Sequence, residues 1–280
     1  TVAETEHAPR PAGPDQVVMT VNARIRVMDK RGNTVVSNSL RRWLEPAVQP
    51  LGTSGVFVIS PWVVYDATAA RFVLSALGTR VDGETVYLVG VSKTSRADGD
   101  WCTYGMSAAV NGDVREDVMA ADLRLGLNDD VLVLSASMAS RTTGRFAYAK
   151  ARLLPKSTFY DTTCPASADW ADIWDFQEPD RPVSDLRPVV GRAGDHDAYL
   201  VNARFDAGDA LSLWRVRTEP GPAPLGQPAR RFERLEIPVP HFSIAPDALQ
   251  PGTDTRVSTG SASLHAAVQH GQHLWTSHTV

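Results

Sequence analysis

Two aspartates and two arginines recur at a fixed spacing and have the side chains best suited to chemistry. The phrase Asp-Leu-Arg begins at Asp122 and at Asp185, and ends at Arg124 and Arg187. Two carboxylates that converge on one pocket can divide the acid and base roles of glycoside hydrolysis. Two guanidinium groups can clamp the carboxylate of an acidic sugar. The phrase therefore predicts Asp122 and Asp185 as catalytic residues and Arg124 and Arg187 as substrate-binding residues.

A structural interpretation of the same phrase stands beside the catalytic one. A residue repeated along a chain often solves a problem that every repeat shares. Aspartate at the start of a strand can accept hydrogen bonds from free backbone N–H groups, and the arginine can pair with it.

Positions where the repeat changes are further candidates for a binding site. In two other repeats, the place of Arg124 and Arg187 is taken by His265, near the C-terminus, and by Val63, nearer the N-terminus. The tetrapeptide Val-Asn-Ala-Arg occurs twice, ending at Arg24 and Arg204, and its last position becomes Met138 and His278 elsewhere. Histidine titrates near neutral pH, so these two imidazoles can respond to a ligand, although ordinary packing or surface exposure would also explain them. The substrate-binding candidates are thus Arg124, Arg187, Arg204, His265 and His278.

Several classes of function lose support from what the sequence lacks. It contains no Gly-x-Ser-x-Gly, no phosphate-binding glycine loop, no His-Glu-x-x-His and no Cys-x-x-Cys. The net charge of −4 is spread without a basic stripe, so nucleic acid is not an expected partner. No membrane span is expected, because the longest apolar run, 56–65, is broken by a serine and a proline.

Two cysteines, Cys102 and Cys164, permit one disulfide, and the alternative is two unrelated buried thiols. A disulfide would favour a secreted or periplasmic location. No metal site or cofactor is assigned, although the turn at 98–100, Asp-Gly-Asp, gives weak support for calcium.

The elements that must position these residues are β-strands. Similar apolar runs, each followed by a polar turn and a second run, begin near residues 61, 122, 185 and 263. Residues 61–106 alone predict four consecutive antiparallel strands with short turns. This pattern favours an all-β fold, a β-propeller of four-stranded antiparallel blades, over a β-sandwich.

The two ends of the chain are expected to differ from the repeated part. Residues 1–13 are polar and predict a disordered leader, and 14–280 predict a single β-propeller domain. The last unit stops after two strands, so the blade is incomplete at the C-terminus. The N-terminal strands could complete it, which would give about five blades.

The pattern resembles a group of secreted bacterial β-propeller proteins, most of them uncharacterised. The phrases that carry the resemblance are Val-Tyr-Asp at 64–66 with Arg-Phe at 71–72, Val-Ser-Lys-Thr-Ser at 91–95 with Gly-Asp-Trp at 99–101, and Leu-Trp-Thr-Ser-His-Thr at 274–279. The loop 95–101 also loosely resembles the Asp-box of sialidase-like propellers, which is a structural turn. The resemblance implies blades and does not imply a reaction.

The sequence therefore predicts a secreted β-propeller that binds or hydrolyses a carbohydrate at the mouth of its central channel. Were it an enzyme, it would be glycoside hydrolase-like and use paired carboxylates. The alternative is a non-catalytic scaffold in which the Asp–Arg pairs hold blades together.

Overall fold

The computed structural model describes residues 11–21, 23–49, 55–166, 168–174, 176–191, 194, 196–217 and 232–278. Within them the chain is almost entirely β-structure, which confirms the all-β prediction. Most of the predicted leader lies outside the described residues. Of its last three residues, Ala12 forms a β-bridge with Val17.

Three four-stranded antiparallel meanders follow one another along the chain and are called sheets A, B and C. Sheet A is separate, whereas sheets B and C are joined, together with hairpin D, into one ten-stranded sheet. Sheet A contains β4 (Val56–Asp66), β5 (Arg71–Arg80), β6 (Thr85–Ser92) and β7 (Trp101–Ser107). Sheet B contains β10 (Val118–Leu127), β11 (Val131–Ser140), β12 (Phe146–Pro155) and β13 (Ala171–Trp174). Sheet C contains β16 (Arg187–Val190), β17 (Asp197–Ala203), β18 (Ala207–Arg217) and β19 (Phe232–Ser243).

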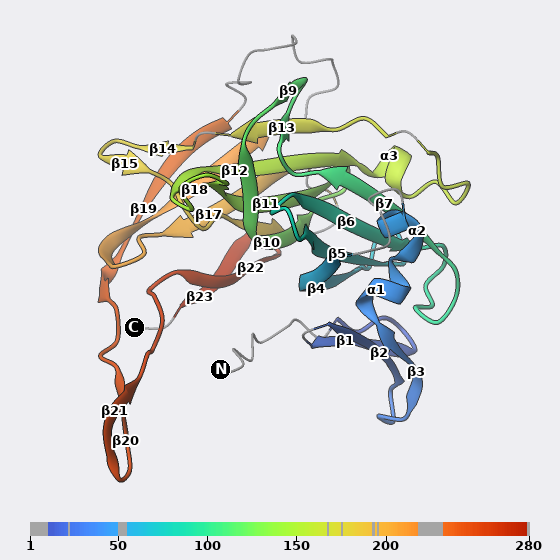
Figure 1. Cartoon of the computed structure of the whole chain (residues 1–280), viewed down its shortest axis with the longest axis horizontal. Helices are drawn as coiled ribbons and strands as arrows, with labels where there is room; N and C mark the ends of the chain where they lie inside the picture. Colours follow the sequence, from blue (N-terminus) through green and yellow to red (C-terminus); the bar gives the residue numbers. More distant parts are fainter. Residues whose placement is uncertain are drawn as a thin grey trace.

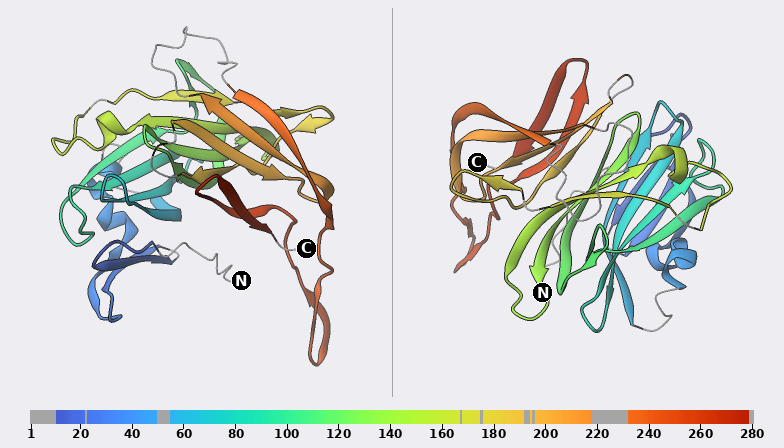
Figure 2. Two further views of the ribbon diagram at one scale, coloured as in Figure 1. Left: turned by 180° about the vertical axis from the view of Figure 1, so that it is seen from behind. Right: turned by 90° about the horizontal axis from the view of Figure 1, so that it is seen from above.

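Shorter pieces lie at the two ends of this series. The N-terminal sheet contains β1 (Gln16–Val21), β2 (Arg24–Asp29) and β3 (Thr34–Ser39). Hairpin D, formed by β22 (Leu264–His270) and β23 (His273–His278), is the last element. Figures 1 and 2 show sheets A, B and C following one another around a curved body, with the N-terminal sheet at one end and hairpin D at the other.

The N-terminal strands do not complete hairpin D, so that expectation is wrong. Among the described residues, β1, β2 and β3 pair with no strand outside their own sheet, and β22 pairs with β16 and β23. The N-terminal sheet instead packs against sheet A, where Val18 and Ile25 share a buried cluster with Val63 and Phe72. Its alternating burial, with Ile25 and Val27 inside, fits a sheet that is covered on one face.

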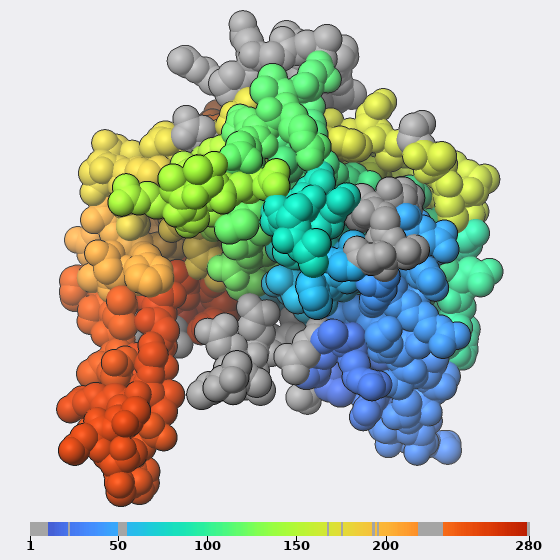
Figure 3. Space-filling model, viewed as in Figure 1, coloured from blue at the N-terminus to red at the C-terminus, as the bar shows by residue number. Residues whose placement is uncertain are grey.

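The remaining elements are short connections. They are the helices α1 (Leu40–Trp43), α2 (Glu45–Val48) and α3 (Lys156–Phe159), and the hairpins β8 (Val110–Asn111) with β9 (Val114–Arg115), β14 (Gln177–Glu178) with β15 (Arg181–Pro182), and β20 (Ala248–Gln250) with β21 (Thr253–Val257). The β20–β21 hairpin projects from the body as a separate arm (Figure 3). Within the described residues, no helix has the length and apolar character needed to cross a membrane.

Apolar side chains join successive sheets face to face. One buried cluster lies between sheets A and B, another between B and C, and a third between C and hairpin D. Strand β6 is buried at every position, because its sheet is covered on both faces. The layers therefore stack in chain order.

The first strands of the units lie side by side. β10 pairs with β16 in parallel at Leu127 and Val190, and β16 pairs with β22 in parallel at Val189 and Ala267. β4 contacts β10 without pairing with it. Residues on these four strands are thereby gathered along the inner side of the curve.

Candidate functional site

The first Asp-Leu-Arg phrase forms a β-bulge in β10, the first strand of sheet B. The pairing of β10 with β11 shifts register between Ala121 and Arg124, and Asp122 has a φ of 56°. Asp185 has a φ of 62°, and Ser60 of β4 has a φ of 49°. A short polar side chain tolerates this left-handed conformation better than most others, so aspartate suits the bulge.

The expectation that both aspartates stand at strand starts needs correction. Asp122 lies inside β10, four residues after Val118, whereas Asp185 does precede β16. The bulge interrupts an otherwise continuous strand, because one extra residue leaves the ladder and the side chains that follow change direction.

The bulge also corrects which residue of sheet A corresponds to the two arginines. In β10 the residue after the register shift is Arg124, which lies opposite Ser135. In β4 the same place is taken by Trp62, which lies opposite Ser75. The equivalent residue is therefore Trp62 and not Val63, whose side chain is fully buried.

A hollow of about 290 Å³ opens where the first strands meet. All four of these strands contribute to its wall, and so does the segment before β1. The lining residues are Pro11, Trp62, Val63, Val64, Tyr65, Arg124, Leu125, Arg187, Pro188, Val190, His265, Ala266, Ala267 and Val268. The wall is mostly apolar, with two arginines and one histidine, and no aspartate or glutamate of the described residues lines it.

The two arginines are fixed by their surroundings. The Arg124 guanidinium lies 5.0 Å from the centre of the Trp62 ring and 3.3 Å from the Asp122 carboxylate. The Arg187 guanidinium lies 2.7 Å from Asp185, and its Nε donates to the carbonyl oxygen of Leu264. Both arginines are more than nine-tenths buried, so their positions in the wall are well defined.

The two predicted catalytic aspartates have different surroundings. The Asp122 side chain is 52% exposed, whereas the Asp185 side chain is only 14% exposed. Each lies beside the arginine two residues further on, and neither lines the hollow. Their catalytic role stays a prediction.

Of the predicted substrate-binding residues, Arg124, Arg187 and His265 meet at the hollow, and Arg204 and His278 do not line it. The exposed Arg204 pairs with Asp180 on the surface. His278 packs edge-on against Phe242, with ring centres 4.7 Å apart, and its Nδ1 lies 3.0 Å from the Ala262 carbonyl oxygen. These two residues therefore have structural partners outside the wall.

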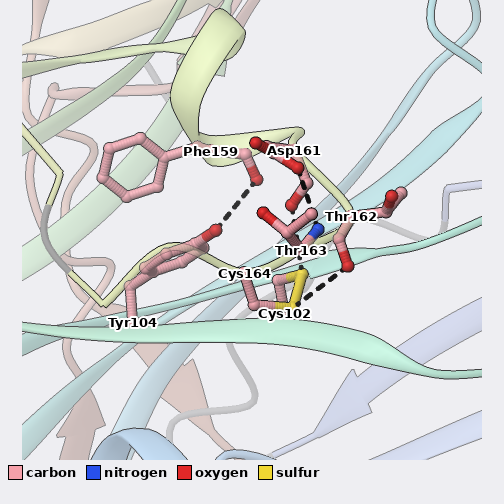
Figure 4. Close-up of a disulfide and its surroundings, with 7 residues drawn as sticks. All are labelled: Cys102, Tyr104, Phe159, Asp161, Thr162, Thr163 and Cys164. Atoms are coloured by element: carbon pink, nitrogen blue, oxygen red, sulfur yellow. Dashed lines mark hydrogen bonds between the residues drawn. A yellow bond between two sulfur atoms is a disulfide. The ribbon is translucent and has the colours of Figure 1, made fainter.

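The predicted disulfide between Cys102 and Cys164 is confirmed. It joins β7 of sheet A to the loop that follows α3 in sheet B (Figure 4). In the same close-up, the Tyr104 hydroxyl donates to the Phe159 carbonyl oxygen. The bond therefore fastens two neighbouring sheets.

The Asp98 turn holds an ion pair. The Arg96 guanidinium donates to both Asp98 oxygens, at 3.0 and 2.7 Å, and the Trp101 indole N–H donates to the Ala97 carbonyl oxygen. No cluster of three or more potential metal-ligating side chains occurs in the part of the chain that the structure describes. Calcium at this turn stays a prediction.

Sequence reasoning missed a buried ionic cluster on the outer strands of sheet B. Arg152 and Asp172 form a two-point ion pair at 2.7 and 2.9 Å. Lys150 Nζ lies 3.5 Å from Asp172 and donates to the carbonyl oxygens of Ala108 and Val110. Burial lowers the pKa of Lys150 to about 7. The sequence does show that Lys150 and Arg152 are two residues apart and so share one face of a strand. It does not show that Asp172, 20 residues after Arg152, is the carboxylate that pairs with them.

No protein-family model and no curated protein matches this chain. A solved structure of xylan beta-1,4-xylosidase from Bacillus halodurans C-125 is similar over 89% of this chain and 46% of its own, with 13% identity and a TM-score of 0.39. PorZ, a surface component of the type-IX secretion system of Porphyromonas gingivalis, matches 100% of this chain and 38% of its own, with 10% identity and a TM-score of 0.22. This chain thus spans less than half the length of either protein. Similarities this low carry no argument about function.

Proposed function

We propose that this chain forms the arc of a β-propeller and binds an acidic carbohydrate in the hollow at the inner side of that arc. Two features of the fold support the propeller. Sheets A, B and C are four-stranded meanders that stack in chain order, and their first strands lie side by side on the inner side of the curve. The N-terminal sheet and hairpin D extend the series to about five units.

One observation carries the proposed ligand. The hollow brings together equivalent residues of the first strands, which are an indole in sheet A and a guanidinium in each of sheets B and C. His265 of hairpin D joins them, and no carboxylate of the described residues lines the wall. The wall presents guanidinium and imidazole groups and no carboxylate, which favours an anion, although each arginine is also paired with an aspartate outside the wall.

The apolar part of the wall favours a ligand that also has a face of C–H groups. A sugar ring has such a face, and Trp62 and Tyr65 offer apolar surface to it. Arginine recognises a carboxylate through two parallel hydrogen bonds. The volume of 290 Å³ is close to the lower end of about 300–1,000 Å³ that small-molecule sites occupy, which suits a single sugar ring.

The disulfide supports a secreted or periplasmic location for this activity. Disulfides persist in oxidising compartments and are rare in the cytosol. Extracellular and periplasmic proteins meet polysaccharides directly, so the location and the ligand class fit each other.

Hydrolysis by Asp122 and Asp185 is the second candidate function. The exposure of the Asp122 carboxylate favours it, because a catalytic carboxylate must reach its substrate. The test is release of reducing sugar from acidic glycans by the wild type, Asp122→Asn and Asp185→Asn. Hydrolysis requires turnover in the wild type and its loss in both variants. Equal turnover in all three would reject these two residues as catalysts.

Calorimetric titration with a hexuronic acid and with the matching neutral hexose tests the proposed ligand. We expect the acid to bind at least about tenfold more tightly, which corresponds to about 1.4 kcal/mol. Arg124→Gln and His265→Ala should weaken binding of the acid. Arg256→Gln, on the exposed β20–β21 hairpin, is the matched control and should bind as the wild type does. Failure of both sugars to bind would overturn the proposed function.

A further inference from the structure

A tryptophan outside the hollow shares a continuous surface with it. In hairpin D, Val268 and Trp275 lie directly opposite each other on adjacent antiparallel strands. Residues opposite each other in such a pair project from the same face of the sheet. Val268 also lines the hollow, so the Trp275 side chain extends the wall of the hollow outward.

The two faces of hairpin D have different environments. Ala267 and Leu264 are buried in the cluster that joins sheet C to the hairpin, and Leu274 packs against that cluster. On the other face Val268 is 46% exposed and Trp275 is 61% exposed. All seven tryptophans of the chain lie in the described residues, and Trp275 alone is exposed. Because Val268 lines the hollow, a ligand that extends beyond the hollow on this side would meet the Trp275 indole.

We infer that Trp275 forms a second sugar-binding subsite and that the ligand is an acidic oligosaccharide. The inference rests on the proposed function of the hollow. The first sugar occupies the hollow beside Arg124, Arg187 and His265, and a later sugar of the same chain stacks its apolar face on the Trp275 indole. Tryptophan supplies a large, rigid contact area at a low cost in side-chain entropy.

The spacing along hairpin D fits more than one sugar ring. His265 and Val268 lie three residues apart on β22, which corresponds to about 10 Å at the usual rise of a strand. Trp275 lies one strand further out, at about 5 Å. A monosaccharide bound beside His265 cannot also reach Trp275, whereas a short oligosaccharide can.

A protein partner fits this surface less well. The large apolar side chains exposed on hairpin D are one valine and one tryptophan, whereas a stable protein interface buries about 800 Å² on each partner. Polar side chains surround the indole, with the His273 ring centre 6.5 Å from that of Trp275 and the exposed Ser277 on the same strand. Hydroxyl groups of a sugar can bond to such neighbours.

The test is a length series of one acidic sugar, from the monomer to the tetramer, titrated against the wild type and Trp275→Ala. We expect the affinity of the wild type to rise by about tenfold from the monomer to the longer oligomers, or about 1.4 kcal/mol. Trp275→Ala should bind the monomer as tightly as the wild type and lose the increase with length. Trp275→Phe should retain part of the increase, because an aromatic face remains.

The controls separate the subsite from the hollow. Phe57→Ala removes another exposed aromatic side chain, on β4, and should leave the whole length series unchanged. Binding of the monomer with no gain from greater length would reject the subsite and leave the proposed function intact. No binding of any sugar would reject the proposed function itself. A wild-type dimer in light scattering that Trp275→Ala converts to a monomer would overturn the inference, because a second chain would then cover the indole.

Discussion

Asp122 and Asp185 share a left-handed backbone conformation, Asp122 in the bulge of β10 and Asp185 just before β16, yet their burial differs greatly. The Asp185 and Arg187 side chains are 14% and 7% exposed, whereas Asp122 is 52% exposed beside an Arg124 side chain that is 10% exposed. Removing one partner of a buried ion pair leaves an uncompensated charge, while an exposed pair is screened by water. The same substitution should therefore have different effects at the two sites.

We expect Asp185→Asn to lower the free energy of unfolding by about 3 kcal/mol, and Asp122→Asn to lower it by less than about 1 kcal/mol. Asparagine tolerates a positive φ as aspartate does, so the comparison isolates the charge. Urea unfolding of both variants measures the difference. Equal losses would show that burial does not set the strength of these pairs.

Lys150 should make stability depend on pH. Burial lowers its pKa from 10.5 to about 7 in the folded protein. The folded state therefore binds fewer protons than the unfolded state between these values, and the stability contributed at this site rises with pH across that range. The cost of charging the buried amine is fully present below about pH 7.

The measurement is the difference in unfolding free energy between the wild type and Lys150→Met at pH 7 and at pH 9. We expect this difference to shift in favour of the wild type at the higher pH. The hydrogen bonds from Lys150 to backbone carbonyls contribute a constant offset that does not produce this shift. Lys30→Met, at an exposed lysine, should show no comparable change, and a pH-independent difference for Lys150→Met would contradict the assignment.

At the scale of elements, a glycine permits the first strands to lie side by side. A Cβ atom on Gly126 would lie 2.6 Å from the Val189 carbonyl oxygen and 2.6 Å from the Pro188 Cβ. These atoms belong to β16, which pairs with β10 one residue further on, at Leu127. Only a residue without a side chain allows this approach of sheets B and C.

Gly126→Ala should lower the free energy of unfolding by about 3 kcal/mol, because backbone atoms must move to accept the methyl group. It should also weaken ligand binding, since Arg124 and Arg187 lie on the two strands that would separate. Gly99→Ala is the matched control, because its nearest atoms are 3.8 Å away, and it should change stability little. A fully stable Gly126→Ala variant would mean that the two strands can separate without cost.

At the scale of the whole molecule, the disulfide and the buried clusters join the sheets in order. The bond between Cys102 and Cys164 closes a loop over a sequence separation of 62 residues. An ion pair between Lys156 and Asp66, to which the Tyr160 hydroxyl also donates, spans the same two sheets. The fastening of sheet A to sheet B thus uses both covalent and polar contacts.

The double variant Cys102→Ser with Cys164→Ser should lose roughly 4 kcal/mol of unfolding free energy, the value that chain entropy gives for a loop of this size. Wild type treated with a reducing agent should lose a similar amount, and the double variant should not respond to the agent. A wild type whose unfolding midpoint is unchanged by complete reduction would contradict this account.

The sequence by itself determined the strands, their turns and the residue types that a bulge requires. Alternating and β-branched runs predict strands from local preference, and an aspartate at a left-handed position follows from the same local geometry. Two cysteines permitted one disulfide. The strand and turn preferences depend on residues that are close in the chain, whereas the disulfide joins residues 62 apart.

Only the tertiary structure decided which of the predicted residues meet. Arg124, Arg187 and His265 share one wall, while Arg204 and His278 lie elsewhere, because strand pairing and register depend on contacts between residues far apart in the chain. The residue equivalent to the two arginines is Trp62 and not Val63, because a bulge adds one residue to β4. Trp275 is exposed because hairpin D is covered on one face only. Hydrophobic pattern shows that a strand has an inner side, but packing decides what that side faces.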